Sequence, residues 1–518
     1  MFGFKSKKVK GDQIMGELKV GIDLGTTNSA CATLVNGKFE YLKYKGGKHL
    51  LPSTILWQDG QLTIGEKAKR ISVLYPENFI KSSKIYMGDF EKIWKIDKRK
   101  FTATDVAAEI LTAIREEAES KYNTQEKITA VITVPAYFSS NQIGETKKAA
   151  EMAGFEVKQI ITEPVAAAIA YGFDDNTDQK LFVVDIGGGT FDVSILEVQG
   201  NSFKTIAIDG DKRLGGDDFD QILLNMCVRE IKESLGLDLS SAEQCELSKE
   251  EFSRAKQRLI LEVENKKIEL SESEKVEIEI PNLLTYKGKN YNFTMPLTRQ
   301  KFEEESSQLF DKIKNIMERC LEEASMTPSE IDKVILVGGT AYIPCIQSYV
   351  KNLFKKDPYS DKPLERLVVM GAALIADDER DAITVLDIIS HSLGIEVIGK
   401  EFEKILVKND RYPISKAKLF TTSYDFQRAV CIAIFEGEDE ACVDNNEFFG
   451  SFYLDNIEHA PAGEPRIEVS FSFDKSRDLT IVAKDINTGS EISLIKRKGR
   501  REDHKKEFLN MINEKVAA

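Results

Sequence analysis

The spacing of hydrophobic residues changes near residue 380 of this 518-residue chain. Before that point, short apolar runs such as Lys19–Asp23 and Leu181–Asp185 alternate with longer amphipathic stretches such as Ala103–Tyr122 and Lys301–Ser325. Apolar runs of strand length between amphipathic helices are typical of a sheet that is buried on both faces. The first part of the chain is therefore predicted to be an α/β structure.

Beyond residue 380 short strand-like runs dominate, such as Ala429–Phe435 and Arg466–Phe473, and in the second of these every other residue is apolar. Turn-forming residues separate these runs, for example Asp444–Asn446 and Asn487–Gly489. Alternation with turns between short runs indicates antiparallel strands that have one buried face. We therefore predict an antiparallel β-domain from Ser392 to about Lys498.

One pattern occurs twice within the α/β part, as VGIDLGTTNS at 20–29 and VVDIGGGTFD at 183–192. Each copy has an apolar strand, an Asp, a glycine-rich turn and a Thr. An Asp at a strand end can hold Mg²⁺ or a water, and glycines let backbone N–H groups approach phosphate oxygens. One such turn would most simply be an ordinary tight connection, but two copies favour a phosphate site between two similar lobes. Neither copy fits GxxxxGK[ST] or GxGxxG, so a P-loop or dinucleotide fold is not indicated.

Composition and charge narrow the function classes. The length and the 42% hydrophobic content predict at least three structural units. The net charge of -14 is spread along the chain, which argues against general nucleic-acid binding. Seven cysteines without a CxxC pair and only four histidines indicate neither a disulfide framework nor a metal cluster, so we expect a cytoplasmic protein. We find no apolar run long enough for a membrane helix and expect residues 1–17 to be a loose basic tail.

Several motifs, taken together and in order, resemble the DnaK (seventy-kilodalton heat-shock) chaperone family. In the α/β part they are GIDLGTTNSA (21–30), TVPAYF (133–138), EPVAAAIAYG (163–172), VVDIGGGTFDVSIL (183–196), LGGDDFD (214–220) and VGGTAYIP (337–344). The resemblance continues through VLDIISHSLGIE (385–396), FEGEDEACVDNNEFFGSFYLDNI (435–457) and APAGEPRIEVSFSFD (460–474). Sugar kinases and actins share the first fold but not this second set of motifs.

The resemblance implies a fold class and a domain order. It implies an actin-like two-lobed ATPase domain, built from duplicated ribonuclease-H-like cores, followed by an antiparallel β-sandwich that binds substrate. The implied bounds are 18–381 for the ATPase domain, 382–387 for an interdomain linker, 388–500 for the β-sandwich and 501–518 for a short helical stub. A full helical lid, which the family usually carries after the sandwich, is expected to be missing.

The resemblance also implies roles for residues of the phosphate half of the site. Asp23 and Asp185 would hold Mg²⁺ through water, and Lys84 would stabilise developing negative charge. The implied catalytic residues are Asp23, Lys84, Glu163, Asp185, Thr190 and Asp192. The implied phosphate-loop residues are Gly25, Thr26, Thr27, Asn28, Gly187, Gly188, Gly189, Gly215 and Gly216.

The nucleoside half departs from the family. The residues that match family contacts are Glu264, Lys267, Ser271, Gly338 and Gly339. Where the family usually has two arginines around the base, this chain has Ile268 and Tyr342. Stacking of Tyr342 on adenine could replace a guanidinium face. The alternative is that Tyr342 packs locally.

In the β-domain, the resemblance implies a hydrophobic groove that grips an extended peptide. Val430 would lie at its central pocket, and Ile398 would lie opposite Ser423. The full set of implied groove residues is Ile395, Ile398, Phe420, Ser423, Val430 and Ile432. Alternating apolar residues in strands are more often ordinary core, and only the family motif favours the groove.

Two further departures concern regulation. Gln159, Thr162 and Val165 stand where the family typically has a different set of residues that contact J-domain proteins. Ile143 replaces an arginine that usually pairs with the switch proline, which is Pro135 here. J-domain stimulation and signalling between domains are therefore expected to be retuned.

The function implied is an ATP-dependent molecular chaperone of the stress-response type. It would bind and release extended hydrophobic segments of unfolded proteins under the control of slow ATP hydrolysis, with ATP or ADP and Mg²⁺ as cofactors. Its partners would be unfolded clients, and J-domain proteins and nucleotide-exchange factors are possible cochaperones. One alternative is an ATP-binding chaperone-like regulator or nucleotide-exchange factor that hydrolyses little ATP. A less favoured alternative is an actin-fold metabolite kinase.

Overall fold

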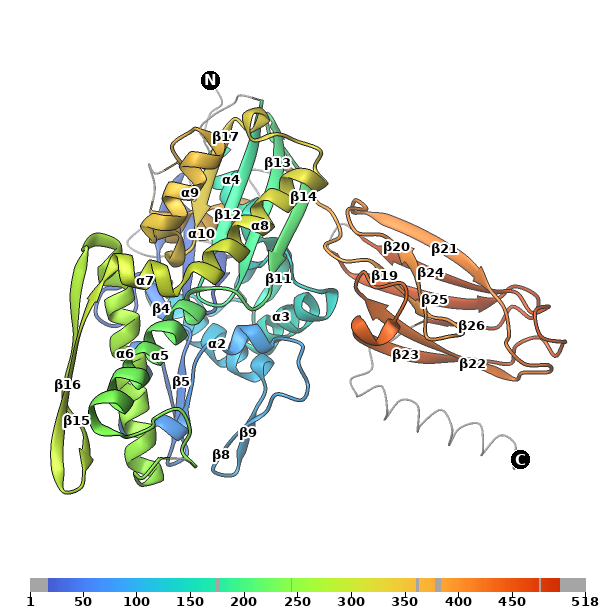
Figure 1. Cartoon of the computed structure of the whole chain (residues 1–518). Coiled ribbons are helices and arrows are strands. Elements are labelled where there is room, and N and C mark those ends of the chain that lie inside the picture. The colour runs from blue at the N-terminus through green and yellow to red at the C-terminus, as the bar shows by residue number, and fades with distance from the viewer. Residues whose placement is uncertain are drawn as a thin grey trace. The chain divides into compact units, whose positions relative to one another are not determined.

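The structure is a computed structural model that describes residues 17–172, 178–243, 245–359, 363–377, 383–474 and 477–493. Its contacts divide the chain into two compact units (Figure 1). The first contains residues 1–136 and 145–385, and the second contains residues 137–144 and 386–518. The predicted stub at 501–518 and nearly all of the predicted tail at 1–17 lie outside the described residues.

The first sheet of the first unit contains the first copy of the repeated motif. Its strands lie in the order β11-β10-β1-β2-β3, with β4 also paired to β2. β1 runs parallel to β10 and antiparallel to β2, and β10 runs parallel to β11. The bounds are β1 Lys19–Leu24, β2 Asn28–Val35, β3 Lys38–Tyr41, β4 Leu50–Pro52, β10 Thr129–Val134 and β11 Glu156–Thr162.

The second sheet repeats this arrangement around the second copy of the motif. Its order is β17-β12-β13-β14-β18, with β12 parallel to β17 and antiparallel to β13. The bounds are β12 Gln179–Ile186, β13 Phe191–Gln199, β14 Ser202–Asp211, β17 Lys333–Val337 and β18 Thr384–Leu386. In both sheets the motif strand has a parallel neighbour on one side and an antiparallel hairpin on the other, so the predicted duplication is confirmed.

Two helices, α4 (Glu163–Gly172) and α10 (Leu364–Ala376), pack closely against each other between the two sheets. Every residue of α4 is buried, which explains why its sequence is apolar all round. The close approach depends on Gly371, because a Cβ atom there would lie 1.8 Å from the carbonyl oxygen of Ala166. The predicted helix at 103–122 is confirmed as α2 (Ala103–Tyr122), which begins with a capping box between Thr102 and Asp105.

Replacing Gly371 by alanine should lower the free energy of unfolding of the first unit by about 1–3 kcal/mol, because the added methyl overpacks this crossing. Without the clash, alanine would stabilise the helix relative to glycine by roughly 1 kcal/mol. A loss of stability in Gly371→Ala would therefore show that the contact with Ala166 decides the outcome. Thermal unfolding measures the effect. Gly339→Ala is the control, since its added Cβ meets no atom within 4 Å. Equal melting temperatures for the two variants would contradict the packing argument.

The remaining elements of the first unit surround the two sheets (Figure 1). The predicted helix at 301–325 is two helices, α7 (Arg299–Glu305) and α8 (Ser307–Glu323), which meet at Ser306. The other helices are α1 Glu66–Ile71, α5 Gly216–Leu235, α6 Lys249–Glu272 and α9 Pro344–Phe354, with short 3₁₀ turns η1 Pro76–Asn78, η2 Ser83–Tyr86, η3 Pro328–Glu330 and η4 Gly339–Tyr342. Helix α3 (Ser140–Met152) begins in the segment 137–144, which is counted with the second unit, and continues in the first. The other strands are β5 Ile55–Gln58, β6 Gln61–Ile64, β7 Phe79–Ile80, β8 Trp94–Ile96, β9 Arg99–Phe101, β15 Lys275–Tyr286 and β16 Lys289–Thr298.

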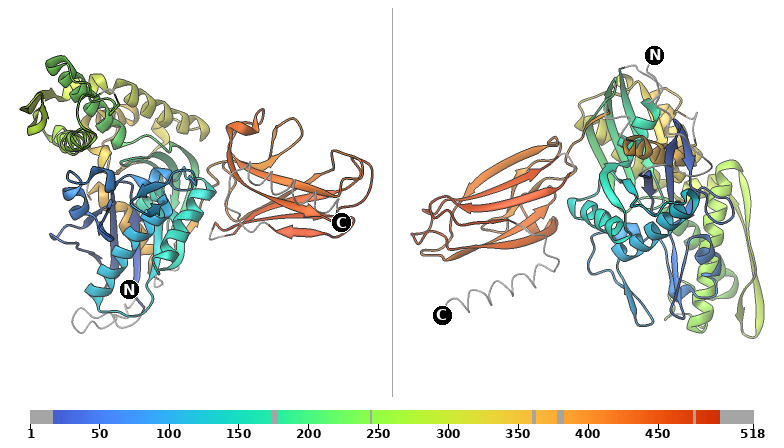
Figure 2. Two further views of the ribbon diagram at one scale, coloured as in Figure 1. Left: turned by 90° about the horizontal axis from the view of Figure 1, so that it is seen from below. Right: turned by 180° about the vertical axis from the view of Figure 1, so that it is seen from behind.

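The second unit contains two antiparallel four-stranded sheets, β20-β19-β22-β23 and β21-β24-β25-β26 (Figure 2). One hydrophobic core takes residues from both sheets, so the predicted β-sandwich is confirmed. The bounds are β19 Leu393–Glu396, β20 Phe402–Leu406, β21 Ile414–Phe420, β22 Ala429–Glu436, η6 Val443–Asn445, β23 Glu447–Asp455, β24 Ile467–Phe473, β25 Leu479–Asp485 and β26 Glu491–Ser493. The predicted turn at 487–489 connects β25 to β26.

Part of the predicted linker forms the edge strand β18 of the second sheet. The backbone N–H of Thr384 donates to the carbonyl oxygen of Asn201 at 2.9 Å. Ile383 and Val385 are partly buried against the core around α4 and α10, whereas the Thr384 side chain is exposed. The polar residue in this apolar run therefore lies on the solvent face of the strand, where it disturbs no packing.

Candidate functional site

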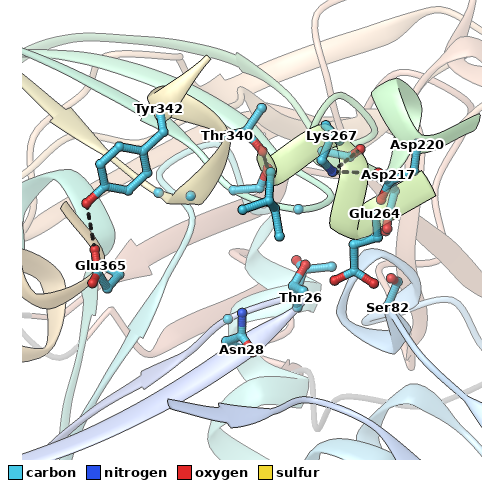
Figure 3. Close-up of a pocket in the computed structure, with 18 of the residues that line it drawn as sticks. Thr26, Asn28, Ser82, Asp217, Asp220, Glu264, Lys267, Thr340, Tyr342 and Glu365 are labelled. Atoms are coloured by element: carbon cyan, nitrogen blue, oxygen red, sulfur yellow. Dashed lines mark hydrogen bonds and ion pairs between the residues drawn. The ribbon is translucent and has the colours of Figure 1, made fainter. Parts of the chain in front are cut away.

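A pocket of about 740 Å³ lies in the first unit, where the loops after β1 and β12 meet α5, α6 and η4 (Figure 3). It brings together most of the residues predicted for the nucleotide site. These are Asp23, Gly25, Thr26, Thr27, Asn28, Lys84, Glu163, Asp185, Gly187, Gly188, Thr190, Gly216, Glu264, Lys267, Ser271, Gly338, Gly339 and Tyr342. The predicted residues Asp192, Gly189 and Gly215 do not line the pocket and lie behind it.

The loops at the centre of the pocket contact one another directly. A Cβ atom on Gly188 would lie 1.8 Å from the hydroxyl oxygen of Thr27, so the two motif loops meet only because a glycine stands there. The carbonyl oxygen of Gly187 accepts from the backbone N–H of Gly216 at 3.0 Å and from the hydroxyl of Thr340 at 2.7 Å. Backbone from both motif copies and from the start of α5 therefore surrounds one space, which suits a phosphate chain.

Two of the predicted glycines outside the pocket lining support these loops from behind. A Cβ atom on Gly215 would lie 2.6 Å from the backbone of Gly188, and one on Gly189 would lie 2.8 Å from a side-chain carbon of Thr26. Glycine is needed at both positions because a larger residue would collide with the neighbouring loop. They shape the phosphate loops without lining the pocket.

Buried charged groups gather at the floor of the pocket. The Nζ of Lys84 lies 2.7 Å from Oε1 of Glu163, and both side chains are buried. Asp23 lies near the end of β1, and Asp185 lies near the end of β12, opposite Asp192 on β13. The hydroxyl of Thr133 donates to Oδ1 of Asp23 at 3.3 Å.

The electrostatics of this cluster follow from burial. Burial, and secondly the charge of Glu163, raises the pKa of Asp23 to about 7, against a smaller opposing effect of Lys84. The pKa of Asp185 is raised well above its usual value, first by burial and then by Glu163, Asp192 and Asp23. Repulsion among the carboxylates therefore exceeds what Lys84 relieves, and a further cation at this place would be stabilised.

This charge balance fits the implied Mg²⁺. Within the described ranges, no group of three Asp, Glu, His or Cys side chains is arranged to hold a metal ion by itself. Asp23 and Asp185 would therefore hold the ion through water, and phosphate oxygens would supply the direct ligands, as Mg²⁺ commonly requires. The carboxylate oxygens of the cluster are the hard donors that this ion prefers.

Residues of α1, α6, η4 and the start of α10 also line the pocket. Lys69 contacts Glu264 at 2.6 Å. Lys267 contacts Asp220 at 2.8 Å and donates to the carbonyl oxygen of Gly216 at 2.9 Å. These lysines therefore already have partners and hold the walls of the pocket in place.

Tyr342, at the end of η4, lines the same pocket. Its hydroxyl donates to Oε2 of Glu365 at 2.9 Å (Figure 3). Ile268 on α6 also lines the pocket and is 61% exposed. The two residues that depart from the family thus line the same pocket as the phosphate loops, and their place beside a base stays a prediction.

Sequence reasoning missed several residues that shape the pocket, among them Lys69, Asp220, Thr340 and Glu365. Thr340 could have been found, because it lies inside the VGGTAYIP motif at 337–344. Asp220 could also have been found, because it is the last residue of the LGGDDFD motif at 214–220. Lys69 and Glu365 carry no local signal. Lys69 meets its partner across 195 residues of sequence, so only the fold brings the two together.

The predicted groove residues of the second unit fall into two groups. Ile395 on β19 and Ile432 on β22 are buried in the sandwich core, and Phe420 and Val430 are partly buried against that core. Ile398, which is 77% exposed, and Ser423 lie in loops and face solvent. The structure thus gives four of these residues a core environment and leaves two accessible.

The predicted J-domain positions are mostly inaccessible. Thr162 at the end of β11 and Val165 on α4 are buried, and only Gln159 of the three is partly exposed. A direct change of surface chemistry can therefore come from Gln159 alone. Thr162 and Val165 could act only through packing.

The two sheets have the same strand arrangement, and the glycine-rich loops after their motif strands meet at one pocket. This arrangement defines a two-lobed, actin-like nucleotide-binding fold, and the chain adds a β-sandwich to it. The chain matches the sequence model of the family described as Hsp70 protein, over residues 19–96 and 91–518. It therefore belongs to the Hsp70 family, and the resemblance to DnaK-type chaperones is confirmed. Members of this family are chaperones and ATPases that bind ATP or ADP with magnesium. In the part of the chain that the structure describes, no helix is both long and apolar enough to cross a membrane.

Proposed function

We propose that this chain is an ATP-dependent chaperone that hydrolyses ATP slowly in the pocket of its first unit. Hydrolysis would control the binding and release of extended hydrophobic segments by its β-sandwich. The observation that carries the proposal is the buried Lys84–Glu163 pair beside Asp23 and Asp185, at the point where two glycine-rich loops meet. Such a site can hold a phosphate chain and stabilise charge on it.

The chemistry follows from the charges at the pocket floor. Lys84 is held by Glu163, so its ammonium group is already oriented and can stabilise negative charge that develops on the transferred phosphoryl group. Asp23 and Asp185 would orient the attacking water and the hydrated cation. Magnesium, when bound, would neutralise charge on the phosphates. Positioning and electrostatic stabilisation, not one strong general base, would therefore carry the reaction.

The partners proposed are unfolded or extended polypeptides, together with a J-domain protein and a nucleotide-exchange factor. A regulator with little turnover would share the pocket but not the reaction, and the retained Lys84 and carboxylates argue against it. Membership of the Hsp70 family gives no support to a metabolite kinase. We also propose a cytoplasmic location, on the basis of cysteine usage.

Peptide affinity with and without nucleotide tests the proposal. A fluorescent hydrophobic peptide should bind the full chain roughly 5- to 150-fold more weakly in ATP and Mg²⁺ than in ADP, the usual range of coupling between two sites. An acidic peptide of equal length is the control and should bind in neither state. An identical affinity of the hydrophobic peptide in ATP, ADP and nucleotide-free buffer would remove the proposed coupling.

A further inference from the structure

The β8–β9 hairpin is strongly basic, although the net charge of the chain is -14. Residues 94–101 include the bases Lys95, Lys98, Arg99 and Lys100 and a single acid, Asp97. The two strands form a sheet of their own, which extends away from the neighbouring helices (Figure 1). None of these residues lines the pocket of the first unit, so the nucleotide site does not account for their charge.

The inner face of the hairpin anchors it to the first unit. Arg99 pairs with Oε1 of Glu109 on α2 at 2.7 Å, and its guanidinium carbon lies 4.5 Å from the centre of the Trp57 ring. Ile96 and Phe101 are buried. Because this face is already packed and paired, the hairpin has a fixed conformation, which lowers the ordering cost of binding a partner.

The outer face of the hairpin carries charge that nothing nearby neutralises. Lys95 lies directly opposite Lys100 in the strand register, and alternation turns both away from the buried Ile96 and Phe101. These two lysines and Lys98 in the turn, here called the outer lysines, are all exposed. Among the described residues, no side chain forms an ion pair or hydrogen bond with their ammonium groups. Like charges opposite each other destabilise an antiparallel pair, and an anionic ligand would relieve that repulsion.

Both edges of the hairpin are open. The sheet consists of β8 and β9, so within the described ranges neither strand has a second neighbour. An extended polypeptide can add to such an edge through its backbone N–H and C=O groups. Every second side chain of the added strand would then lie on the face of Lys95 and Lys100. Acidic side chains at alternate positions would therefore meet the outer lysines.

A nucleic acid suits this face less well than a polypeptide. Proteins hold single strands by stacking bases on aromatic rings along a basic groove. The rings of this hairpin are engaged elsewhere, because Phe101 is buried and Trp94 packs edge-on against Tyr86 with ring centres 5.6 Å apart. A long polyanion would also be repelled by the net charge of -14, whereas a short acidic segment meets the hairpin alone.

We propose that the β8–β9 hairpin is a docking site for an extended acidic segment of a partner protein. The segment adds to the hairpin as a further strand, and its carboxylates pair with the outer lysines. This site recognises negative charge at alternate positions, whereas the peptide site proposed for the β-sandwich recognises hydrophobic segments. The proposal therefore goes beyond ATP-controlled peptide binding and does not depend on it.

Fluorescence anisotropy of a labelled peptide that alternates glutamate and threonine tests the proposal on the full chain. The triple variant Lys95→Gln, Lys98→Gln, Lys100→Gln should weaken peptide binding roughly 3- to 150-fold, the combined effect of three exposed ion pairs. Added salt should weaken binding to the wild type, because exposed ion pairs are screened. A peptide of the same sequence with alternate backbone nitrogens methylated should bind more weakly, because it cannot add as a strand.

A second hairpin of the first unit provides the matched control. Lys275, Lys287 and Lys289 of β15–β16 are also exposed and lie outside the pocket. The triple variant Lys275→Gln, Lys287→Gln, Lys289→Gln loses the same charge but should bind the acidic peptide as the wild type does. Matching melting curves for both triple variants and the wild type show that all three proteins fold.

Several outcomes would overturn the proposal. They are absence of binding to the wild type, equal losses in the two triple variants, binding that is insensitive to salt, and equal affinity for the methylated peptide. Tighter binding of a single-stranded oligonucleotide of equal charge would assign the face to nucleic acid. Self-association of the chain that the outer lysines support, measured by sedimentation, would assign it to a second copy. No nucleotide enters these measurements, so their failure would leave the proposed ATP-dependent function standing.

Discussion

Replacing Lys84 by alanine should lower the rate of single-turnover ATP hydrolysis by roughly 100- to 1,000-fold, the usual cost of removing one group that stabilises the transition state. Lys84 is buried and contacts Glu163 at 2.7 Å, beside two carboxylates whose pKa values are raised. Without its ammonium group, the developing charge on the transferred phosphoryl group would lose one of the positive groups that stabilise it, while the buried carboxylates remain. The affinity for nucleotide should fall much less than the hydrolysis rate, because the glycine-rich loops and the other residues that line the pocket remain intact.

Rapid quench of a single turnover measures the rate, and ADP titration measures binding. Lys48→Ala is a matched control, since Lys48 is an exposed lysine that pairs with Glu66 at 3.0 Å outside the pocket. It should hydrolyse ATP at the wild-type rate. Equal rates in the wild type and in Lys84→Ala would remove Lys84 from the mechanism, whereas a wild type without turnover would favour the regulator alternative.

Elements with a strong local signal could be predicted from the sequence. The amphipathic run at 103–122 is flanked by a capping box, so both its type and its start were readable. The apolar run at 429–435 likewise matches β22 (Ala429–Glu436). The break at Ser306 was not readable, because the apolar spacing continues from α7 into α8 across the interruption. A helical period reports a buried face but not the continuity of the helix.

The site was predictable where its residues lie in the repeated motif or at positions that the family resemblance identifies. The phosphate loops lie inside two short motifs, so their glycines and aspartates could be named in advance. Glu365 reaches the pocket through tertiary packing, and nothing in its local sequence distinguishes it from a surface carboxylate. The same limit applies to the β-sandwich, where alternation alone could not separate Ile398, which is exposed, from Ile432, which is buried.

A buried ion pair in the second unit gives the other large expected effect. Arg477, at the turn before β25, contacts Asp387, and their side chains are only 8% and 3% exposed. The guanidinium carbon lies 5.2 Å from the centre of the Tyr412 ring, and Oδ1 of Asp387 accepts from the backbone N–H of Ile388 at 2.9 Å. Asp387 closes the segment predicted as the linker, so this pair ties its last residue to the sandwich.

Arg477→Ala should lower the free energy of unfolding of the second unit by about 3–5 kcal/mol, because it leaves the buried Asp387 carboxylate without its arginine. Hydrogen exchange of the β24 and β25 amides in the full chain measures the loss. Lys418→Ala breaks a half-exposed pair with Glu403 and should cost less than about 1 kcal/mol. Arg477 also has a φ of 63°, a conformation that glycine adopts more easily. Arg477→Gly should therefore lose the same ion pair but be roughly 1 kcal/mol more stable than Arg477→Ala. Equal hydrogen-exchange protection in Arg477→Ala and Lys418→Ala would show that the Arg477–Asp387 pair contributes little.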